Sequence, residues 1–143
     1  MFQTLKAFPA RTAQMLIPAT LKWIFCFGIL AHSATAAEGW VAVDGDTLRS
    51  PAGVVVRIAN IDAPEAAGKC QCQAECALAA KATAYVRASL SRAGAVELRP
   101  YSRPKDRHGR TLAYVMVDGR DLGEMLVSEG LARRWTGRRE PWC

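Results

Sequence analysis

The stretch from residue 43 to residue 65 concentrates side chains that can act on a phosphate group. It carries two acidic pairs, separated by a turn and by an apolar strand with a single arginine: Asp44 and Asp46, Asp62 and Glu65, and Arg57. Carboxylates held close together repel one another unless a cation lies among them. A guanidinium beside them is suited to a phosphate oxygen. A metal, a base and a phosphate clamp in one place indicate phosphoryl chemistry.

Short strands and turns must bring these groups together. The Asp-Gly dipeptide at 44–45 and the Pro-Ala-Gly sequence at 51–53 are typical of turns. Residues 54–61 are rich in β-branched side chains and predict a strand. Pro64 ends it, because proline cannot donate to a sheet ladder. Meandering strands of this kind can bring both acidic pairs and the arginine to one end of a sheet.

The rest of the chain supplies further strands and two helices. The hydrophobic spacing predicts about three short strands over 40–60, a helix over 74–93, strands over 95–99 and 110–117, a helix over 122–129 and a last strand over 131–135. Pro100 is expected to close the strand that begins at Ala95, and Asp121 to cap the second helix. About five strands broken by two helices suggest a small closed barrel, although periodicity alone sets neither strand order nor closure.

The first 36 residues have the pattern of a secretory signal. Residues 1–22 carry three basic side chains and no acid, residues 23–31 are apolar, and Ala34-Thr35-Ala36 is a small-x-small cleavage site. The apolar run is short for a membrane span. We therefore expect a signal peptide over 1–36, a domain over 37–143, and a secreted or periplasmic protein; an uncleaved membrane anchor is the alternative.

Charge and cysteine content fit an exported, mildly basic domain. The chain has a net charge of +6, and cleavage after Ala36 would remove three of its 19 basic residues and none of its 13 acids, leaving +3. Cleavage would also leave an even number of cysteines, which predicts two disulfides: Cys70, Cys72, Cys76 and Cys143. We favour Cys143 bridging back to the 70–76 cluster and the other two pairing locally, with a strained Cys72–Cys76 bridge disfavoured. Zinc is the less favoured alternative, because C-x-C-x3-C fits no common zinc pattern.

Four motifs in the chain resemble those of the staphylococcal nuclease (thermonuclease) family, in family order. They are D-G-D-T at 44–47, V-R-I-A-N-I-D-A-P-E at 56–65, D-R-H-G-R-T-L-A at 106–113 and L-V-S-E-G-L-A-R at 126–133. The resemblance implies an OB-like five-stranded barrel with two to three packed helices. It also implies calcium-dependent hydrolysis of DNA and RNA phosphodiesters by a thermonuclease-like endonuclease. Because nothing in the motifs reads base edges, we expect little sequence preference. We also expect single-stranded or frayed duplex substrates to be favoured, and a monomer with no stable protein partner.

The resemblance also assigns roles to individual residues. The metal ligands fall on Asp46, Asp62 and the backbone carbonyl of Ala63, and the proposed general base falls on Glu65. The phosphate-contacting arginines fall on Arg57 and Arg110. Arg107 and His108 are further candidates for substrate binding. The chain departs from the family pattern in three places. His108 stands where the family often has Tyr, three cysteines follow Glu65, and the third C-terminal helix is missing or reduced to a stub.

Other functions remain open at this point. OB-like barrels often bind single strands without catalysis, so a non-catalytic nucleic-acid-binding module is the main alternative, and the intact acidic set argues against it. A structural domain stabilised by calcium is a third possibility. The arginines at 133, 134, 138 and 139 form either a nucleic-acid stripe or a solvated face, while Trp135 and Trp142 are expected to pack as core or lid rather than to stack on bases.

Overall fold

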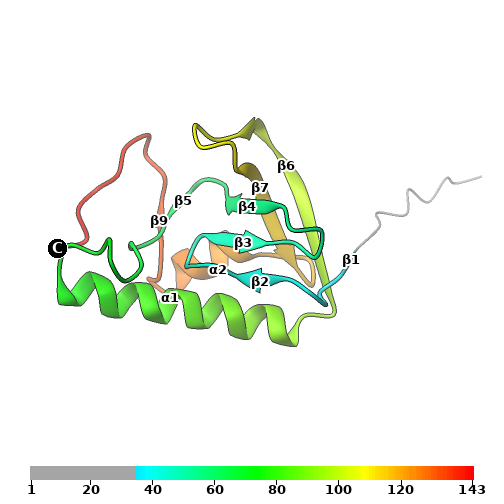
Figure 1. The fold of residues 1–143 in the computed structure, drawn as a ribbon, viewed down its shortest axis with the longest axis horizontal. Coiled ribbons are helices and arrows are strands. Elements are labelled where there is room, and N and C mark those ends of the chain that lie inside the picture. The colour runs from blue at the N-terminus through cyan, green and yellow to red at the C-terminus, as the bar shows by residue number, and fades with distance from the viewer. Residues whose placement is uncertain (1–34) are drawn as a thin grey trace, which may run out of the picture. The chain divides into compact units, whose positions relative to one another are not determined.

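The computed structural model describes residues 35–143 (Figure 1). The expected cleavage point after Ala36 lies at the very start of this part, and the basic and apolar segments before it lie outside the described residues. Within residues 35–143, no helix is long and apolar enough to cross a membrane.

Seven of the strands in this part form one mixed sheet. They are β1 (Thr35–Ala36), β2 (Val41–Ala42), β3 (Thr47–Arg49), β4 (Val55–Ile58), β6 (Ala95–Lys105), β7 (Thr111–Val117) and β8 (Arg120–Asp121). The spatial order is β1-β6-β7-β4-β3-β2, with β8 paired to β7. Strands β4 and β7 run parallel, and the other neighbours run antiparallel. Two further strands, β5 (Ile61–Asp62) and β9 (Arg133–Arg134), form a separate antiparallel pair.

The two helices of the described part bury one face each. Helix α1 (Gln73–Arg92) is rich in alanine, a strong helix former, and its buried Ala79, Ala82, Val86 and Leu90 recur at helical spacing. Helix α2 (Leu122–Ser128) is capped as expected, because the Asp121 carboxylate accepts from two backbone N–H groups of the first turn. Beyond β9, residues 135–143 contain no helix.

The hydrophobic core lies between the sheet and the two helices. Its fully buried side chains come from β3, β4, β6, β7, α1 and α2: Leu48, Val56, Ile58, Val86, Val96, Val115, Leu122 and Leu126. Successive side chains of a strand point to opposite faces of the sheet. Since Val56 and Ile58 point into the core, Arg57 between them points to the other face, where it is half-buried. The alternation in β4 therefore sets the arginine apart from the core.

The sheet does not close on itself through backbone pairing within residues 35–143. Strands β1 and β2 lie at the two ends of the strand order and do not pair with each other. The closed barrel suggested by the strand count is wrong in this respect. The physical reason is that α1 packs beside β2 and covers this edge, so that a helix takes the place of a closing strand (Figure 1).

Strand β6 is longer than the sequence predicts. The sequence predicts an end at Pro100, but the strand continues to Lys105, with a shift of register between Pro100 and Lys105. Its partner β1 pairs only with Ala95 and Val96, so the rest of β6 has β7 as its one neighbour in the sheet. Proline is tolerated on such an edge, because the missing N–H faces no partner strand.

Candidate functional site

The Asp44-Gly45-Asp46 turn enters β3 and packs tightly against α1. The Asp44 carboxylate accepts from the backbone N–H of Asp46 at 3.0 Å, which fixes the turn. A Cβ added at Gly45 would lie 2.8 Å from the Cβ of Ala82 and 3.2 Å from the Cβ of Ala63. Only glycine fits this approach, so the turn places Asp46 beside the segment that carries the second acidic pair.

Asp46 is a buried carboxylate with two close partners. Its side chain accepts from the Thr47 hydroxyl at 3.0 Å and from Arg57 Nη1 at 2.5 Å. Burial raises the pKa of Asp46 above its ordinary value, and this outweighs the opposing effect of Arg57, while the nearby Asp44 carboxylate raises the pKa further. The charged form of Asp46 would therefore be stabilised by a further positive charge.

Arg57 connects the two acidic pairs. In the β3–β4 register Arg57 lies opposite Thr47, the residue that follows Asp46. The second terminal nitrogen of Arg57 donates to the carbonyl of Ile61 at 3.3 Å. The chain turns back between β4 and β5 at Asn60, which has a φ of 63°, a left-handed conformation that asparagine tolerates better than most residues. One guanidinium thus spans from Asp46 to the residue that precedes Asp62.

Asp62 and Ala63 are buried, and Asp62 is covered by the C-terminal segment. The Asp62 side chain accepts from Arg139 Nε at 3.1 Å and from the Trp142 indole N–H at 3.3 Å. The residues Asp62 and Ala63 are each 3% exposed. Ala63 lines the cleft described below, whereas Asp62 does not, because its two oxygens face these tail residues.

Glu65 is held through its backbone by an acid that sequence reasoning missed. The backbone N–H of Glu65 donates to Glu75 Oε1 at 3.1 Å, and the N–H of Gln71 donates to Glu75 Oε2 at 2.6 Å. Glu75 lies in the first turn of α1 and is buried. Its position three residues after the N-cap Cys72 is the available sequence signal, since an acid there commonly binds backbone N–H groups. The Glu65 side chain itself forms an ion pair with Arg139.

Arg110 is oriented by Asp106, a second residue that the expected roles left out. Asp106 accepts from Arg110 Nε at 2.6 Å and from the backbone N–H groups of His108 and Arg110. Burial raises the pKa of Asp106, but the hydrogen bonds from Arg110 and from these backbone groups together hold it below its ordinary value. Arg110 Nη1 also lies 3.4 Å from the Thr47 hydroxyl, which ties this loop to Asp46.

These contacts join most of the predicted site residues into one network. It runs from Arg110 through Thr47, Asp46 and Arg57 to Ile61, and its neighbours Asp62 and Glu65 are bridged by Arg139. Arg107 and His108 lie apart from it, exposed on the β6–β7 turn, where Arg107 Nε lies 3.1 Å from His108 Nε2.

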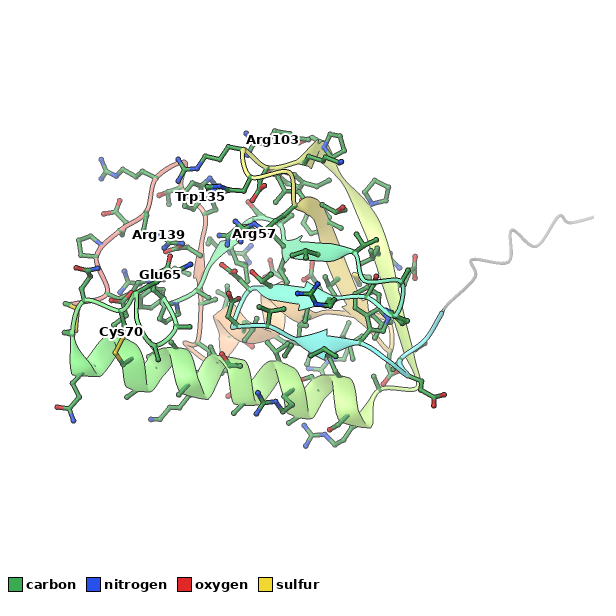
Figure 2. The ribbon with its side chains drawn as sticks, viewed as in Figure 1. Arg57, Glu65, Cys70, Arg103, Trp135 and Arg139 are labelled. Carbon is green, nitrogen blue, oxygen red and sulfur yellow. A yellow bond between two sulfur atoms is a disulfide. The ribbon has the colours of Figure 1, made fainter. Side chains whose placement is uncertain are left out.

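A polar cleft of about 960 Å³ opens over this network. Its lining includes more basic than acidic side chains: Arg57, Lys69, Arg103, Arg107, Arg110, Arg138 and Arg139 against Asp44, Asp46, Glu65 and Asp106. Trp135, which is 37% exposed, and Tyr101 also line it. Figure 2 shows Arg103 at the top of this region, Glu65 and Arg139 lower down, and Trp135 between them. An excess of positive charge in a cleft attracts a polyanion.

The four cysteines within residues 35–143 form two disulfides, as predicted. Cys72 is bonded to Cys143, and Cys70 is bonded to Cys76. The first bridge joins the chain terminus to the start of α1 across 71 residues of sequence. The prediction that Cys143 bridges back to the 70–76 cluster is confirmed, and all four thiols are used, which leaves none of them as a zinc ligand.

The oxygen donors of the site suit a hard divalent cation. Asp46 and Asp62 offer buried carboxylates and Ala63 offers a backbone carbonyl, the ligand types that calcium prefers. No three His, Cys, Asp or Glu side chains within residues 35–143 converge as a ready-made metal cluster. The calcium ligands expected from the motifs include only two such side chains, Asp46 and Asp62. The raised pKa of Asp46 indicates a desolvated carboxylate, whose charged form a cation would stabilise. These oxygen types suit the ion, and the Asp46 and Asp62 carboxylates are each paired with an arginine.

Comparison with known proteins agrees with the motifs. No curated protein matches the chain. The family model described as staphylococcal nuclease homologue matches residues 55–141, more than half of the chain. The match includes Arg57, Asp62, Glu65 and Arg110 and begins after Asp46. The mixed sheet with two helices agrees with the OB-like barrel of this family, with the open edge noted above. The chain belongs to the staphylococcal nuclease family.

Proposed function

We propose that this protein is an exported, calcium-dependent nuclease that hydrolyses phosphodiester bonds in DNA and RNA with little sequence preference. Membership of a family that typically hydrolyses phosphodiesters, and is generally calcium-dependent, supports the reaction class. The observation that carries the proposal is the contact network that links Arg110, Asp46 and Arg57 beneath one basic cleft. Two arginines and the buried carboxylate of Asp46 in one cleft suit the charge that develops in phosphoryl transfer.

Glu65 is the residue we assign to the attacking water. Its side chain lines the cleft and is 31% exposed, so that it can contact a water molecule. Its backbone is fixed by Glu75, which limits the positions that the carboxylate can take. A carboxylate in this position accepts the proton of the water, or orients the water, as the oxygen attacks phosphorus.

Arg57 and Arg110 are the residues we assign to the phosphate. The Arg57 fork approaches from β4 and the Arg110 fork from the loop before β7. Charge on the phosphoryl oxygens rises in the transition state, and guanidinium donors fixed beforehand stabilise it without reorganisation. Calcium held by Asp46, Asp62 and the Ala63 carbonyl would supply further neutralisation of the phosphate and of the attacking oxygen.

The expected substrate is a flexible strand. The cleft offers arginines for phosphates and Tyr101 and Trp135 for apolar contact, and such surfaces bind single strands with little reading of base edges. We therefore propose that single-stranded DNA, RNA and frayed duplex ends are favoured, and that the protein acts as a monomer. The two disulfides support export, because such bonds persist in oxidising compartments.

Cleavage of single-stranded DNA and of RNA by the purified protein tests the proposal. The protein is first chelated exhaustively, and calcium, magnesium, manganese or zinc is then restored singly. We expect no cleavage after chelation, rescue by calcium, and loss of rescue in Asp46→Asn. Full activity in the chelated sample, or rescue by zinc alone, would overturn the metal assignment. Retention of nucleic acid without cleavage under any ion would favour the non-catalytic binding module.

A further inference from the structure

The C-terminal tail, residues 136–143, is anchored at the site by three contacts. Cys143 is bonded to Cys72 at the start of α1. The Arg133 guanidinium donates to the carbonyl of Pro141 at 2.9 Å and lies 3.8 Å from the centre of the Trp142 ring. A tail without regular structure is thus fixed at its end, and it returns from β9 to α1 as an arch (Figure 1).

This anchoring places Arg139 on both carboxylates of the second acidic pair. Arg139 Nε donates to Asp62 Oδ1, and the same guanidinium forms an ion pair with Glu65. The indole N–H of Trp142 donates to the other oxygen of Asp62. Figure 2 shows Arg139 extending from the tail toward Glu65. Both oxygens of Asp62, which we propose for calcium, and one oxygen of Glu65, which we propose for water, therefore contact tail donors.

Arg139 and Arg57 differ in how easily they can leave their carboxylates. The Arg57 side chain is 14% exposed and comes from the middle of β4, whereas the Arg139 side chain is 42% exposed and comes from an irregular segment. The exposed guanidinium of Arg139 can be hydrated when it leaves, whereas the buried Asp62 carboxylate requires a new positive partner. An incoming cation can therefore displace Arg139 at small cost while Arg57 stays in place.

We propose that Arg139 is an internal counter-ion that occupies the second acidic pair in the absence of calcium and must be displaced when the ion binds. This inference rests on the proposed calcium site. Arg139 then lowers the affinity for the ion, because the binding free energy is reduced by the contacts that are broken. It also stabilises the calcium-free protein, because Asp62 is buried and would otherwise lack a positive partner.

The adjacent Arg138 offers a matched control. It has the same charge, its side chain is 80% exposed, and it pairs with Glu140 rather than with the acidic pair of the site. Arg138→Gln and Arg139→Gln therefore change the net charge equally, and only Arg139→Gln frees Asp62 and Glu65. Arg139→Lys keeps the charge and loses the fork, so its affinity should lie between those of Arg139→Gln and the unaltered protein.

The test is a calorimetric titration with calcium chloride of chelated protein expressed from the full chain, without nucleic acid. We expect Arg139→Gln to bind calcium about tenfold more tightly than the unaltered protein, the size of one exchanged charge-assisted contact, and Arg138→Gln to change little. Thermal unfolding gives a second measurement. Arg139→Gln should lower Tm in chelator and enlarge the rise in Tm on adding calcium, whereas a merely structural role would lower Tm equally in both conditions.

The outcomes separate the counter-ion from the calcium site itself. Equal tightening by Arg138→Gln and Arg139→Gln would show a general charge effect and overturn the inference alone. Weaker calcium binding by Arg139→Gln would show that the arginine supports the ligands, and would also overturn it. Absence of calcium binding by every variant, with Asp46→Asn as the blank, would overturn the proposed calcium site and the inference together.

Discussion

The buried carboxylates of Asp46 and Asp62 are each paired with an arginine, and these two arginines differ in exposure. Arg57 donates to Asp46 with one terminal nitrogen and to the Ile61 carbonyl with the other. Arg110 is held by Asp106 and reaches Thr47. Burying a charge is costly unless it is paired and hydrogen-bonded. The acidic partners thus hold the guanidinium groups of Arg57 and Arg110 in fixed positions at the cleft, where they can bind a phosphate.

Arg57→Lys tests whether the guanidinium fork matters beyond its charge. Lysine keeps the charge but cannot donate to Asp46 and to the Ile61 carbonyl from two fixed nitrogens. We expect turnover on single-stranded DNA to fall about a hundredfold or more, with the fold retained by circular dichroism and urea unfolding. Arg49→Lys, on an exposed position of β3, is the control and should change turnover little. Near-normal turnover of the Arg57 variant would show that Arg57 acts as a surface charge only.

Asp106→Asn tests the acid that orients Arg110. The pKa of Asp106 is held below 3.8, so the folded protein favours its charged form more than the unfolded chain does. The stability that it contributes is present above the ordinary pKa and is lost as pH falls through the lowered one. The free energy of unfolding of the unaltered protein should thus exceed that of the variant by a constant amount at neutral and mildly acidic pH. The two curves should converge only below pH 3.8; convergence already near neutral pH would contradict this account.

At the scale of elements, the turn between β2 and β3 and the helix α1 fix each other. Asp46 is placed by a turn that has no room for a side chain at Gly45, and the limiting neighbours are Ala82 on α1 and Ala63 beside Asp62. The backbone N–H of Ile58 donates to the carbonyl of Asp46 at 2.8 Å, which also ties the turn to β4. The position of one carboxylate therefore depends on three elements that are distant in sequence.

Gly45→Ala should destabilise the protein by about 1–3 kcal/mol, the usual cost of overpacking a close contact. The closest atom would be the Cβ of Ala82, which cannot swing aside because it is attached directly to the helix backbone. Urea unfolding of Gly45→Ala, Ala82→Gly and the double variant measures the coupling between the two positions. The cost of Gly45→Ala should shrink in the Ala82→Gly background; an unchanged cost would mean that the clash is not the cause.

At the scale of the whole molecule, the two disulfides close loops of different length. The Cys72–Cys143 bridge spans 71 residues and the Cys70–Cys76 bridge spans 6. A cross-link that closes a longer loop removes more conformational entropy from the unfolded chain. We expect the paired Ser replacement of Cys72 and Cys143 to cost about 2–5 kcal/mol.

The paired Ser replacement of Cys70 and Cys76 is the matched control and should cost less. Urea unfolding of both double variants measures the difference, and thiol titration of the unfolded unaltered protein should find no free thiol among these four cysteines. Equal costs would contradict the loop-closure account. Four free thiols would show that the bridges do not form.

Local sequence was sufficient for the features that depend on neighbouring residues. The β-branched stretch over 54–61 predicted β4, which ends earlier than expected, at Ile58. The alanine-rich stretch predicted α1 to within one residue at each end, and Asp121 was recognised as the α2 cap. These depend on backbone propensity, side-chain period and capping, which act over a few residues. The even cysteine count likewise predicted two disulfides, and the ordered motifs indicated the family. The roles of Asp46, Asp62, Ala63, Glu65, Arg57 and Arg110 remain predictions from those motifs.

The tertiary structure decided which distant groups meet. The passage of β6 through Pro100 depends on having a neighbour strand on one side only, which composition does not reveal. The pairing of Arg139 with Asp62 joins residues 77 positions apart, and the bond from Glu65 to Glu75 joins a loop to a helix. Such contacts arise from burial and chain topology, so an arginine in an irregular tail looks the same in sequence whether it is solvated or lies on a buried carboxylate. Here the disulfide to Cys72 and the packing of Trp142 on Arg133 select the second arrangement.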